Sequence, residues 1–256
     1  MGVSALPDDT GFKAAILIPV YNHEEAIGIT LAQVLAHPWD VLMVDDGSSE
    51  RCRDVLISLA EQYHDRVSLV RLEQNGGKGA AVKAGFQALL AKGYTHAVQI
   101  DADGQHDITD LPEFMAKGSQ MPEVLVSGHP KYDDSVPALR YYARYLTHIW
   151  VWINTLSFQI KDTMCGFRVY PLKAVVTMLD KEPCGNRMDF DTEVMVRWVW
   201  RNGKVHNIPT QVHYPLDGVS HFDALKDNVL ISLMHTRLFF GMLKRLPKIL
   251  WSRLRG

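Results

Sequence analysis

The sequence predicts an α/β fold with a mostly parallel sheet that helices cover on both faces. Two observations support this prediction. Short apolar runs alternate with longer segments of helical spacing through the first half of the chain. The apolar runs are also too short for helices and are closed by turn residues, which is typical of buried strands. Strands that alternate with helices form parallel sheets, because each crossover helix packs back onto the sheet.

The first half of the chain supplies most of these elements. Strands are predicted at residues 14–20, 40–46, 66–72, 96–100 and 123–128. Helices are predicted at residues 24–37, 50–63 and 76–93, where apolar residues recur with helical spacing. The order is strand, helix, strand, helix, as a parallel sheet requires.

The second half is less regular. A long aromatic segment at 136–158 and the segment 189–203, which Gly203 ends, are predicted to be helical. Residues 165–171 and 204–212 read as strands and 214–222 as a loop. The remainder reads as a helix with a kink at Pro247. We therefore expect one domain over residues 1–222 and an amphipathic helical tail over 223–256.

Bulk composition limits the function classes. The chain has 256 residues, of which 47% are apolar and 22% charged, so a folded core is expected. A net charge of -2 gives no indication of nucleic-acid binding. The three cysteines have no CxxC spacing, which indicates reduced thiols in the cytoplasm. The N-terminus does not resemble a signal peptide, and no apolar run reaches the roughly 20 residues of a membrane-spanning helix.

Polar residues follow three of the predicted strands. They are Tyr21 and Asn22, the pair Asp45–Asp46, and the segment Asp101–Asp103. In open α/β sheets, ligands bind beyond the carboxyl ends of the strands. The three clusters therefore predict one ligand site at that edge of the sheet.

Asp101 and Asp103 are candidates for a divalent cation site. Mg²⁺ and Mn²⁺ prefer hard oxygen ligands and commonly also take oxygens from a substrate phosphate. Gln105 would add a neutral amide oxygen. The alternative is a solvated turn in which Asp107 caps the next helix.

Two further segments are candidates for nucleotide contacts. Asp45 or Asp46 would accept hydrogen bonds from a base or ribose, and the alternative is an Asx turn with a serine helix cap. The segment "NGGKGAAVKAG" (75–85) matches neither common phosphate-loop pattern. Its glycine amides and Lys78 would still approach an anion, although a plain helix-entry loop fits equally well.

Several motifs occur together in one order. They are "PVYN" (19–22), "VDDGSS" (44–49), "NGGKGAAVKAGF" (75–86), "DADGQHD" (101–107), "CGFRVYP" (165–171) and "DFDTEVMVR" (189–197). In this combination, residues 14–222 resemble family 2 glycosyltransferases, and most closely the dolichyl- and polyprenyl-phosphate sugar synthases and related bacterial lipid glycosyltransferases. The resemblance implies the Rossmann-like GT-A fold, a nucleotide-diphosphate sugar donor, Mg²⁺ or Mn²⁺, and inversion at the anomeric carbon.

The resemblance also implies roles for individual residues. Those expected at the nucleotide are Pro19, Tyr21, Asp45 and Asp46. Those expected at the metal are Asp101, Asp103 and Gln105. Arg168 is expected to meet a phosphate of the donor or acceptor, and Asp191 and Glu193 are expected near the acceptor.

The chemistry of sugar transfer assigns catalytic roles to three of these residues. A metal on Asp103 and the cation of Arg168 would stabilise the diphosphate leaving group. A hydroxyl acceptor would need a base, for which Asp191 is the candidate, whereas a phosphate acceptor needs only positioning. The alternative for Asp191 and Glu193 is that one caps the helix and the other pairs with Arg197.

The C-terminal segment 228–254 is apolar, with interspersed Lys and Arg. Basic amphipathic helices bind the interface of anionic membranes. The alternatives are packing on its own domain or in a homo-oligomer such as a dimer. We expect a peripheral enzyme on the cytoplasmic face of the membrane.

The predicted function is inverting transfer of a sugar from a nucleotide sugar to a lipid-linked acceptor, either a polyprenyl phosphate or a lipid hydroxyl. One alternative is a nucleotidyltransferase that makes a nucleotide sugar. Such enzymes need a glycine-rich basic loop after the first strand, and "PVYNHEEA" (19–26) has neither Gly nor Lys. The other alternative is a non-catalytic module that binds nucleotide sugar or lipid, against which the acids at the strand ends argue.

Overall fold

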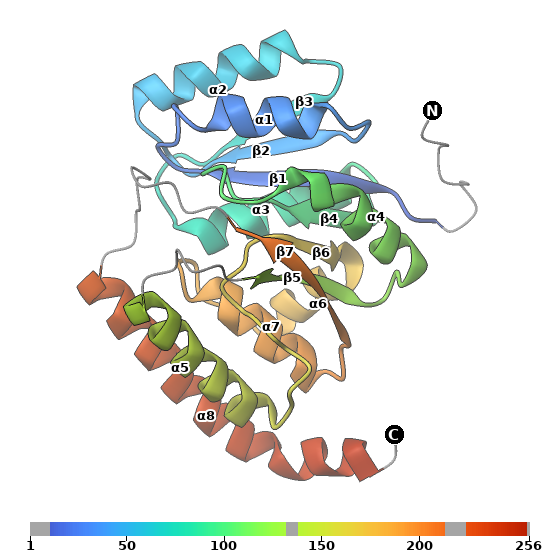
Figure 1. The fold of residues 1–256 in the computed structure, drawn as a ribbon, viewed down its shortest axis with the longest axis vertical. Coiled ribbons are helices and arrows are strands. Elements are labelled where there is room, and N and C mark those ends of the chain that lie inside the picture. The colour runs from blue at the N-terminus through green and yellow to red at the C-terminus, as the bar shows by residue number, and fades with distance from the viewer. Residues whose placement is uncertain (1–10, 132–137, 213–223, 255–256) are drawn as a thin grey trace.

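A computed structural model describes residues 11–131, 138–212 and 224–254 (Figure 1). The strands are β1 (Ala14–Val20), β2 (Val41–Asp45), β3 (Val67–Arg71), β4 (His96–Gln99), β5 (Leu125–Lys131), β6 (Arg168–Pro171) and β7 (Val205–Gln211). The helices are α1 (Ile27–Leu35), α2 (Glu50–Gln62), α3 (Lys78–Ala91), α4 (Leu111–Gln120), α5 (Ala138–Thr155), α6 (Leu172–Lys181), α7 (Phe190–Trp200) and α8 (Ala224–Leu254). A short 3-10 helix at Ile108–Asp110 precedes α4.

The strands form one sheet in the order β3-β2-β1-β4-β6-β5-β7. All neighbouring strands pair in parallel except β6, which runs antiparallel to both β4 and β5. The predicted mostly parallel α/β fold is confirmed. The segment predicted as a strand at 123–128 is β5, but it does not lie beside β4, because β6 is inserted between them.

Helices cover both faces of the sheet, and the side chains of β1 alternate between two cores. Ile16 and Ile18 pack with α1, α2 and α4 on one face. Leu17 packs with α3, α6 and α7 on the other face. Every residue from Ala15 to Val20 is buried, as expected of a strand that is covered on both sides.

Helices α5 and α8 lie side by side against α7, at the end of the molecule away from α1 and α2 (Figure 1). One face of α8 is buried in the core through Met234, Leu238, Met242 and Ile249. Pro247 lies inside α8, and the ribbon changes direction toward the C-terminal end of this helix (Figure 1). In the part of the chain that the structure describes, no helix combines the length and apolar character needed to cross a membrane.

The predicted helical tail is therefore present as α8. The predicted domain boundary between residues 222 and 223 and the predicted loop 214–222 lie outside the described residues.

Candidate active site

Three acidic or basic side chains from distant segments meet at the carboxyl edge of the sheet. Asp101 follows β4, Lys78 is the first residue of α3, and Asp191 lies in the first turn of α7. Lys78 Nζ lies 2.8 Å from Asp101 Oδ1 and 2.7 Å from Asp191 Oδ2. The ammonium group of Lys78 therefore bridges two carboxylates.

The bridge is largely shielded from solvent, with side-chain exposures of 17% for Lys78, 21% for Asp101 and 9% for Asp191, which strengthens the interaction between its charges. Burial alone would lower the pKa of Lys78, but the neighbouring Asp101 and Asp191 carboxylates outweigh it and raise that pKa. Burial would likewise raise the pKa of Asp101, yet Lys78 and His106 hold it well below its usual range. Lys78 and Asp101 are therefore both charged at neutral pH.

His106 and Gly166 lie against the Asp101 carboxylate on two further sides. His106 Nε2 lies 3.4 Å from Asp101 Oδ2. Burial disfavours protonated His106, but the contact with Asp101 prevails and raises the pKa of His106 to about 10. A Cβ atom at Gly166 would overlap the Asp101 carboxylate, so only glycine fits at this position.

Arg168 lies beneath Asp191 and is fully buried. Its guanidinium donates to the Asp191 carbonyl at 2.8 Å, to the Thr163 carbonyl at 2.6 Å and to the Tyr170 hydroxyl at 3.0 Å. Its Nη1 atom lies 3.6 Å from Asp191 Oδ1. The structure thus places Arg168 as an internal support of Asp191, whereas the expected phosphate contact requires an accessible side chain.

The residues predicted to bind metal border one small pocket. Asp101, Asp103, Gln105, His106 and Arg144 line a pocket of about 90 Å³. Asp103 Oδ1 accepts a hydrogen bond of 3.1 Å from the Gln105 amide. Two carboxylates and an amide oxygen on one pocket are donors suited to Mg²⁺ or Mn²⁺. Among the described residues no group of three or more His, Cys, Asp or Glu side chains has the arrangement of a metal site, so the fit rests on this mixed oxygen set.

Asp45 and Asp46 are buried and hold the surrounding loops. Asp45 Oδ1 accepts from the Ser48 amide, and Asp46 accepts from the amides of Gly76 and Gly77, each at 2.8 Å. Burial raises the pKa of Asp46, and the two glycine amides oppose that rise. The Asx turn expected at Asp45 is therefore present, and it does not exclude the predicted contact of these acids with a nucleotide.

The remaining predicted site residues have different environments. Pro19 is buried in β1, and Tyr21 is partly exposed just beyond the end of that strand. Glu193 is fully buried and pairs with Arg197 at 2.6 Å, as the helix spacing suggested. It lies two residues after Asp191 but does not join the bridge with Lys78.

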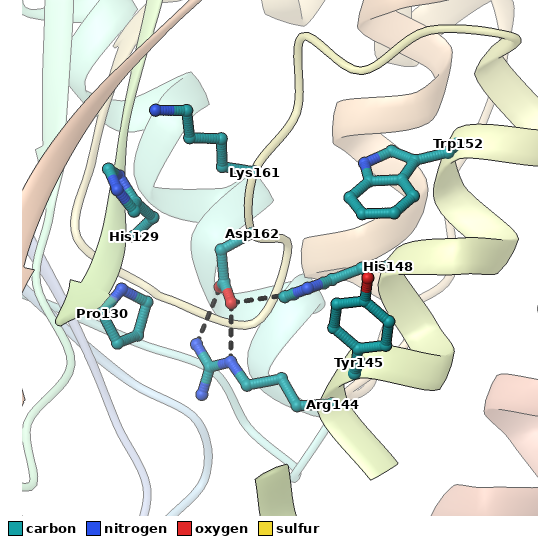
Figure 2. Close-up of a pocket in the computed structure, with 8 residues that line it drawn as sticks. All are labelled: His129, Pro130, Arg144, Tyr145, His148, Trp152, Lys161 and Asp162. Carbon is teal, nitrogen blue, oxygen red and sulfur yellow. Dashed lines mark hydrogen bonds and ion pairs between the residues drawn. The ribbon is translucent and has the colours of Figure 1, made fainter. Parts of the chain in front are cut away.

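A second, larger pocket of about 240 Å³ lies beside the first and shares Arg144 with it. The lining residues come from β5, α5 and the α5–β6 loop: His129, Pro130, Arg144, Tyr145, His148, Trp152, Lys161 and Asp162. Figure 2 shows Asp162 in the middle, Tyr145 and Trp152 on one side, and His129 and Lys161 on the other. The pocket thus combines cations with aromatic walls.

Asp162 organises this pocket. Its carboxylate accepts from Arg144 Nε at 2.6 Å, from Arg144 Nη2 at 2.7 Å and from His148 Nε2 at 3.0 Å (Figure 2). Burial opposes its charge, but the Arg144 guanidinium and His148 hold the pKa of Asp162 well below its usual range. Such paired, buried charges keep the side chains in fixed positions.

Sequence reasoning missed this second pocket. One signal was present, because Arg144, His148 and Trp152 recur every four residues on one face of the long aromatic helix. The other participants, His129 and Asp162, come from segments that no local pattern connects to α5.

Comparisons with known proteins identify the family of the chain. Residues 15–176 match the family model described as glycosyl transferase family 2. A relative from Pectobacterium carotovorum, named undecaprenyl-phosphate 4-deoxy-4-formamido-L-arabinose transferase, is 29% identical over 130 residues, which are 48% of this chain and 39% of that protein. A dolichyl-phosphate beta-glucosyltransferase of Trichomonas vaginalis is 27% identical over 219 residues, which are 77% of this chain and 64% of that protein.

Solved structures share the fold. TarS residues 1–349 from S. aureus, in complex with UDP, superpose with a TM-score of 0.54 and 14% identity, covering 91% of this chain and 71% of that one. A mycobacterial protein gives a TM-score of 0.61 at 15% identity, covering 91% of this chain and 74% of the other. At these identities the superpositions establish the fold alone. The family model spans more than half of the sequence, and the chain therefore belongs to glycosyl transferase family 2.

Proposed function

We propose that the chain transfers a sugar, with inversion, from a nucleotide-diphosphate sugar to a polyprenyl phosphate. The observation that carries this proposal is the pair of adjoining pockets that share Arg144. The acidic pocket would receive the diphosphate end of the donor, and the cationic pocket would receive the acceptor phosphate. The names of the polyprenyl-phosphate relatives support this choice, although the chain spans only about two fifths of the first of them.

On the donor side, Asp101, Asp103 and Gln105 would hold Mg²⁺ or Mn²⁺. When bound, the metal supplies positive charge that neutralises the leaving diphosphate. Lys78 lies 2.8 Å from Asp101 and adds a fixed positive charge at the same edge. Tyr21, Asp45 and Asp46 would form the nucleotide side of the site, with UDP as the first nucleotide to test because a structural relative binds it.

On the acceptor side, the cationic pocket suits a phosphate monoester. Arg144 and Lys161 supply positive charge, and Tyr145 and Trp152 supply apolar walls for the first carbons of a lipid. A phosphate acceptor is already ionised and needs only to be positioned. A lipid hydroxyl would instead need a base, and Asp191 is engaged with Lys78 at 2.7 Å. The geometry therefore favours the phosphate acceptor.

We also propose contact with a membrane surface through α5 and α8. Their outward side exposes large apolar side chains, namely Tyr145, Leu146, Trp150, Leu233, Phe240, Leu243, Leu250 and Trp251. Interspersed Lys and Arg residues on α8 would attract anionic headgroups. A lipid-linked acceptor would reach the cationic pocket from that side, because Tyr145 belongs to both the pocket and the exposed face. The expected location is the cytoplasmic face of the membrane, and a homo-oligomer through the same helices is the competing arrangement.

The test is incubation of the purified chain with labelled nucleotide sugars, Mn²⁺ and undecaprenyl phosphate, followed by extraction of labelled lipid. The same reaction with undecaprenol should give no product, since that lipid offers a hydroxyl in place of the phosphate. Labelling of undecaprenol alone would refute the phosphate acceptor. No product from either lipid with any donor would refute the proposed function.

Site variants sharpen this assay. Asp103→Asn should abolish transfer, because it removes a carboxylate from the diphosphate pocket. Asp54→Asn is the matched control, since the Asp54 side chain is 65% exposed on α2, pairs with Arg53 and does not line the pocket. Full activity of Asp103→Asn would contradict the assignment of the donor pocket.

A further inference from the structure

The loop between α6 and α7, residues 182–189, packs on the first turn of α3. The Ala80 amide donates to the Asn186 carbonyl at 3.0 Å. Lys83 Nζ donates to the carbonyls of Cys184 and Gly185, at 3.0 and 3.2 Å. A Cβ at Gly79 would come within 2.9 Å of the Gly185 carbonyl oxygen, so the two segments are in close contact. The position of the α6–α7 loop therefore affects where α3 begins.

Lys78 is the first residue of α3 and carries the ion bridge of the candidate active site. Both of its carboxylate partners lie on other elements. A shift of the first turn of α3 would move the ammonium group away from Asp101 and Asp191 together. The α6–α7 loop is thus in a position to control the geometry of the bridge.

Two arginines of α8 contact acids that hold the start and the middle of this loop. Arg237 Nη2 lies 2.7 Å from Glu193 Oε2, and the same oxygen accepts the Gly185 amide at 2.8 Å. Arg245 Nη2 lies 3.0 Å from Glu182 Oε2, at the start of the loop. Glu193 is fully buried, whereas the Arg237 side chain is 55% exposed, and Glu193 also pairs with Arg197 of α7 at 2.6 Å. The buried carboxylate is therefore held in one position by several charged and backbone donors.

We propose that Arg237 and Arg245 are positioning residues: through Glu193 and Glu182 they fix the α6–α7 loop, and through that loop they hold Lys78 between Asp101 and Asp191. The inference goes beyond sugar transfer, because it assigns a role in the site to a helix that lies outside it. It does not require a particular donor or acceptor. It also connects the exposed apolar side of α8 to the site, because those apolar residues and the two arginines lie on the same helix.

The test compares two double variants of the full chain by amide hydrogen exchange. Arg237→Met with Arg245→Met removes the two contacts from α8 and leaves the pairs that Arg197 of α7 makes with Glu193 and Glu182 in place. Lys244→Met with Lys248→Met removes the same charge from exposed positions of the same helix and serves as the matched control. Exchange is read at residues 182–189 and 76–83, with residues 50–62 of α2 as the internal reference. No substrate is present, so failure of the proposed activity would leave this test intact.

The arginine variant should exchange several-fold faster at residues 182–189 and 76–83, with α2 unchanged. The lysine variant should match the unmodified chain, and Arg237→Lys with Arg245→Lys should restore most of the protection. Faster exchange confined to α8, or spread equally over α2, would overturn the proposal, because a purely structural helix gives one of those two results. If the double variant does not fold, Arg237→Met alone is compared with Lys244→Met in the same way.

Discussion

Replacing Lys78 with methionine removes the only cation that the described structure places between Asp101 and Asp191, while keeping a side chain of similar length. The Asp101 Oδ1 and Asp191 Oδ2 atoms lie 2.8 and 2.7 Å from Lys78 Nζ, so they are at most 5.5 Å apart. At that separation and an effective dielectric constant of about 20, two unit charges repel by about 3 kcal/mol. We expect Lys78→Met to lose about that much free energy of unfolding at neutral pH.

The loss should depend on pH, with a sign that follows from linkage. In the unmodified chain the pKa of Asp101 is depressed, so its contribution to stability is present at neutral pH and is lost as the pH falls. In Lys78→Met, repulsion raises the pKa of one carboxylate above its unfolded value, so that variant loses stability as the pH rises. The difference between the two proteins should therefore shrink toward acidic pH.

Urea unfolding at several pH values measures this effect. The control is the double variant Lys78→Met with Asp191→Asn, which removes the repulsion and should recover most of the lost stability at neutral pH. If Lys78→Met matched the unmodified chain, or if Asp191→Asn gave no recovery in its background, the bridge would not have the energetic role assigned to it.

Three further predictions follow from buried contacts. Gly166→Ala should lower the free energy of unfolding by about 1–3 kcal/mol, because the added methyl group overlaps the Asp101 carboxylate. Gly28→Ala, at an open position of α1, should leave the free energy of unfolding unchanged, and urea unfolding measures both variants. His235 is buried, and burial lowers its pKa from 6.5 to about 4. The free energy of unfolding should therefore fall by up to about 3 kcal/mol as the pH falls through that range. In a His235→Gln variant the free energy of unfolding should fall less over the same range. Asp162→Ala should lower the free energy of unfolding by about 3 kcal/mol or more, since it leaves the largely buried Arg144 guanidinium without its carboxylate partner. An unchanged melting temperature would contradict the pairing described.

The sequence was sufficient for the elements whose patterns are local. The apolar run at 14–20 is β1 with the same bounds, the run at 40–46 is β2 with one residue fewer at each end, and Ser49 caps α2 as serine was expected to do. The pairing of Glu193 with Arg197 was also accessible, because residues four apart face each other on a helix. In each case a few neighbouring residues determine the outcome.

The position of β6 could not be obtained in this way. Its four residues end at Pro171 and pair antiparallel with β4 and β5, and the sequence predicts a strand at 165–171 but no place for it in the sheet. Strand order depends on which surfaces pack together over long distances, and a segment of four residues does not encode its neighbours. Helix α6 follows Pro171 directly, with no turn residues to mark its start, and was not predicted.

The same difference applies to the site. Parallel strands bring Asp45 and Asp101 to one edge, so that convergence followed from fold class alone. The carboxylate partners of Lys78 could not be predicted from the fold class. A glycine-rich loop with a lysine has the same sequence whether the lysine binds an anionic ligand or bridges two carboxylates of the protein. The contacts divide the acids at this edge into two groups. Asp45, Asp46 and Asp101 each interact with a backbone amide or a lysine from another part of the site. Asp103 borders the small pocket, and among the described residues the Gln105 amide is its one hydrogen-bond donor. In the proposed function, Asp103 is therefore the carboxylate that would turn to a metal ion at the least cost, while the surrounding acids keep the loops in place.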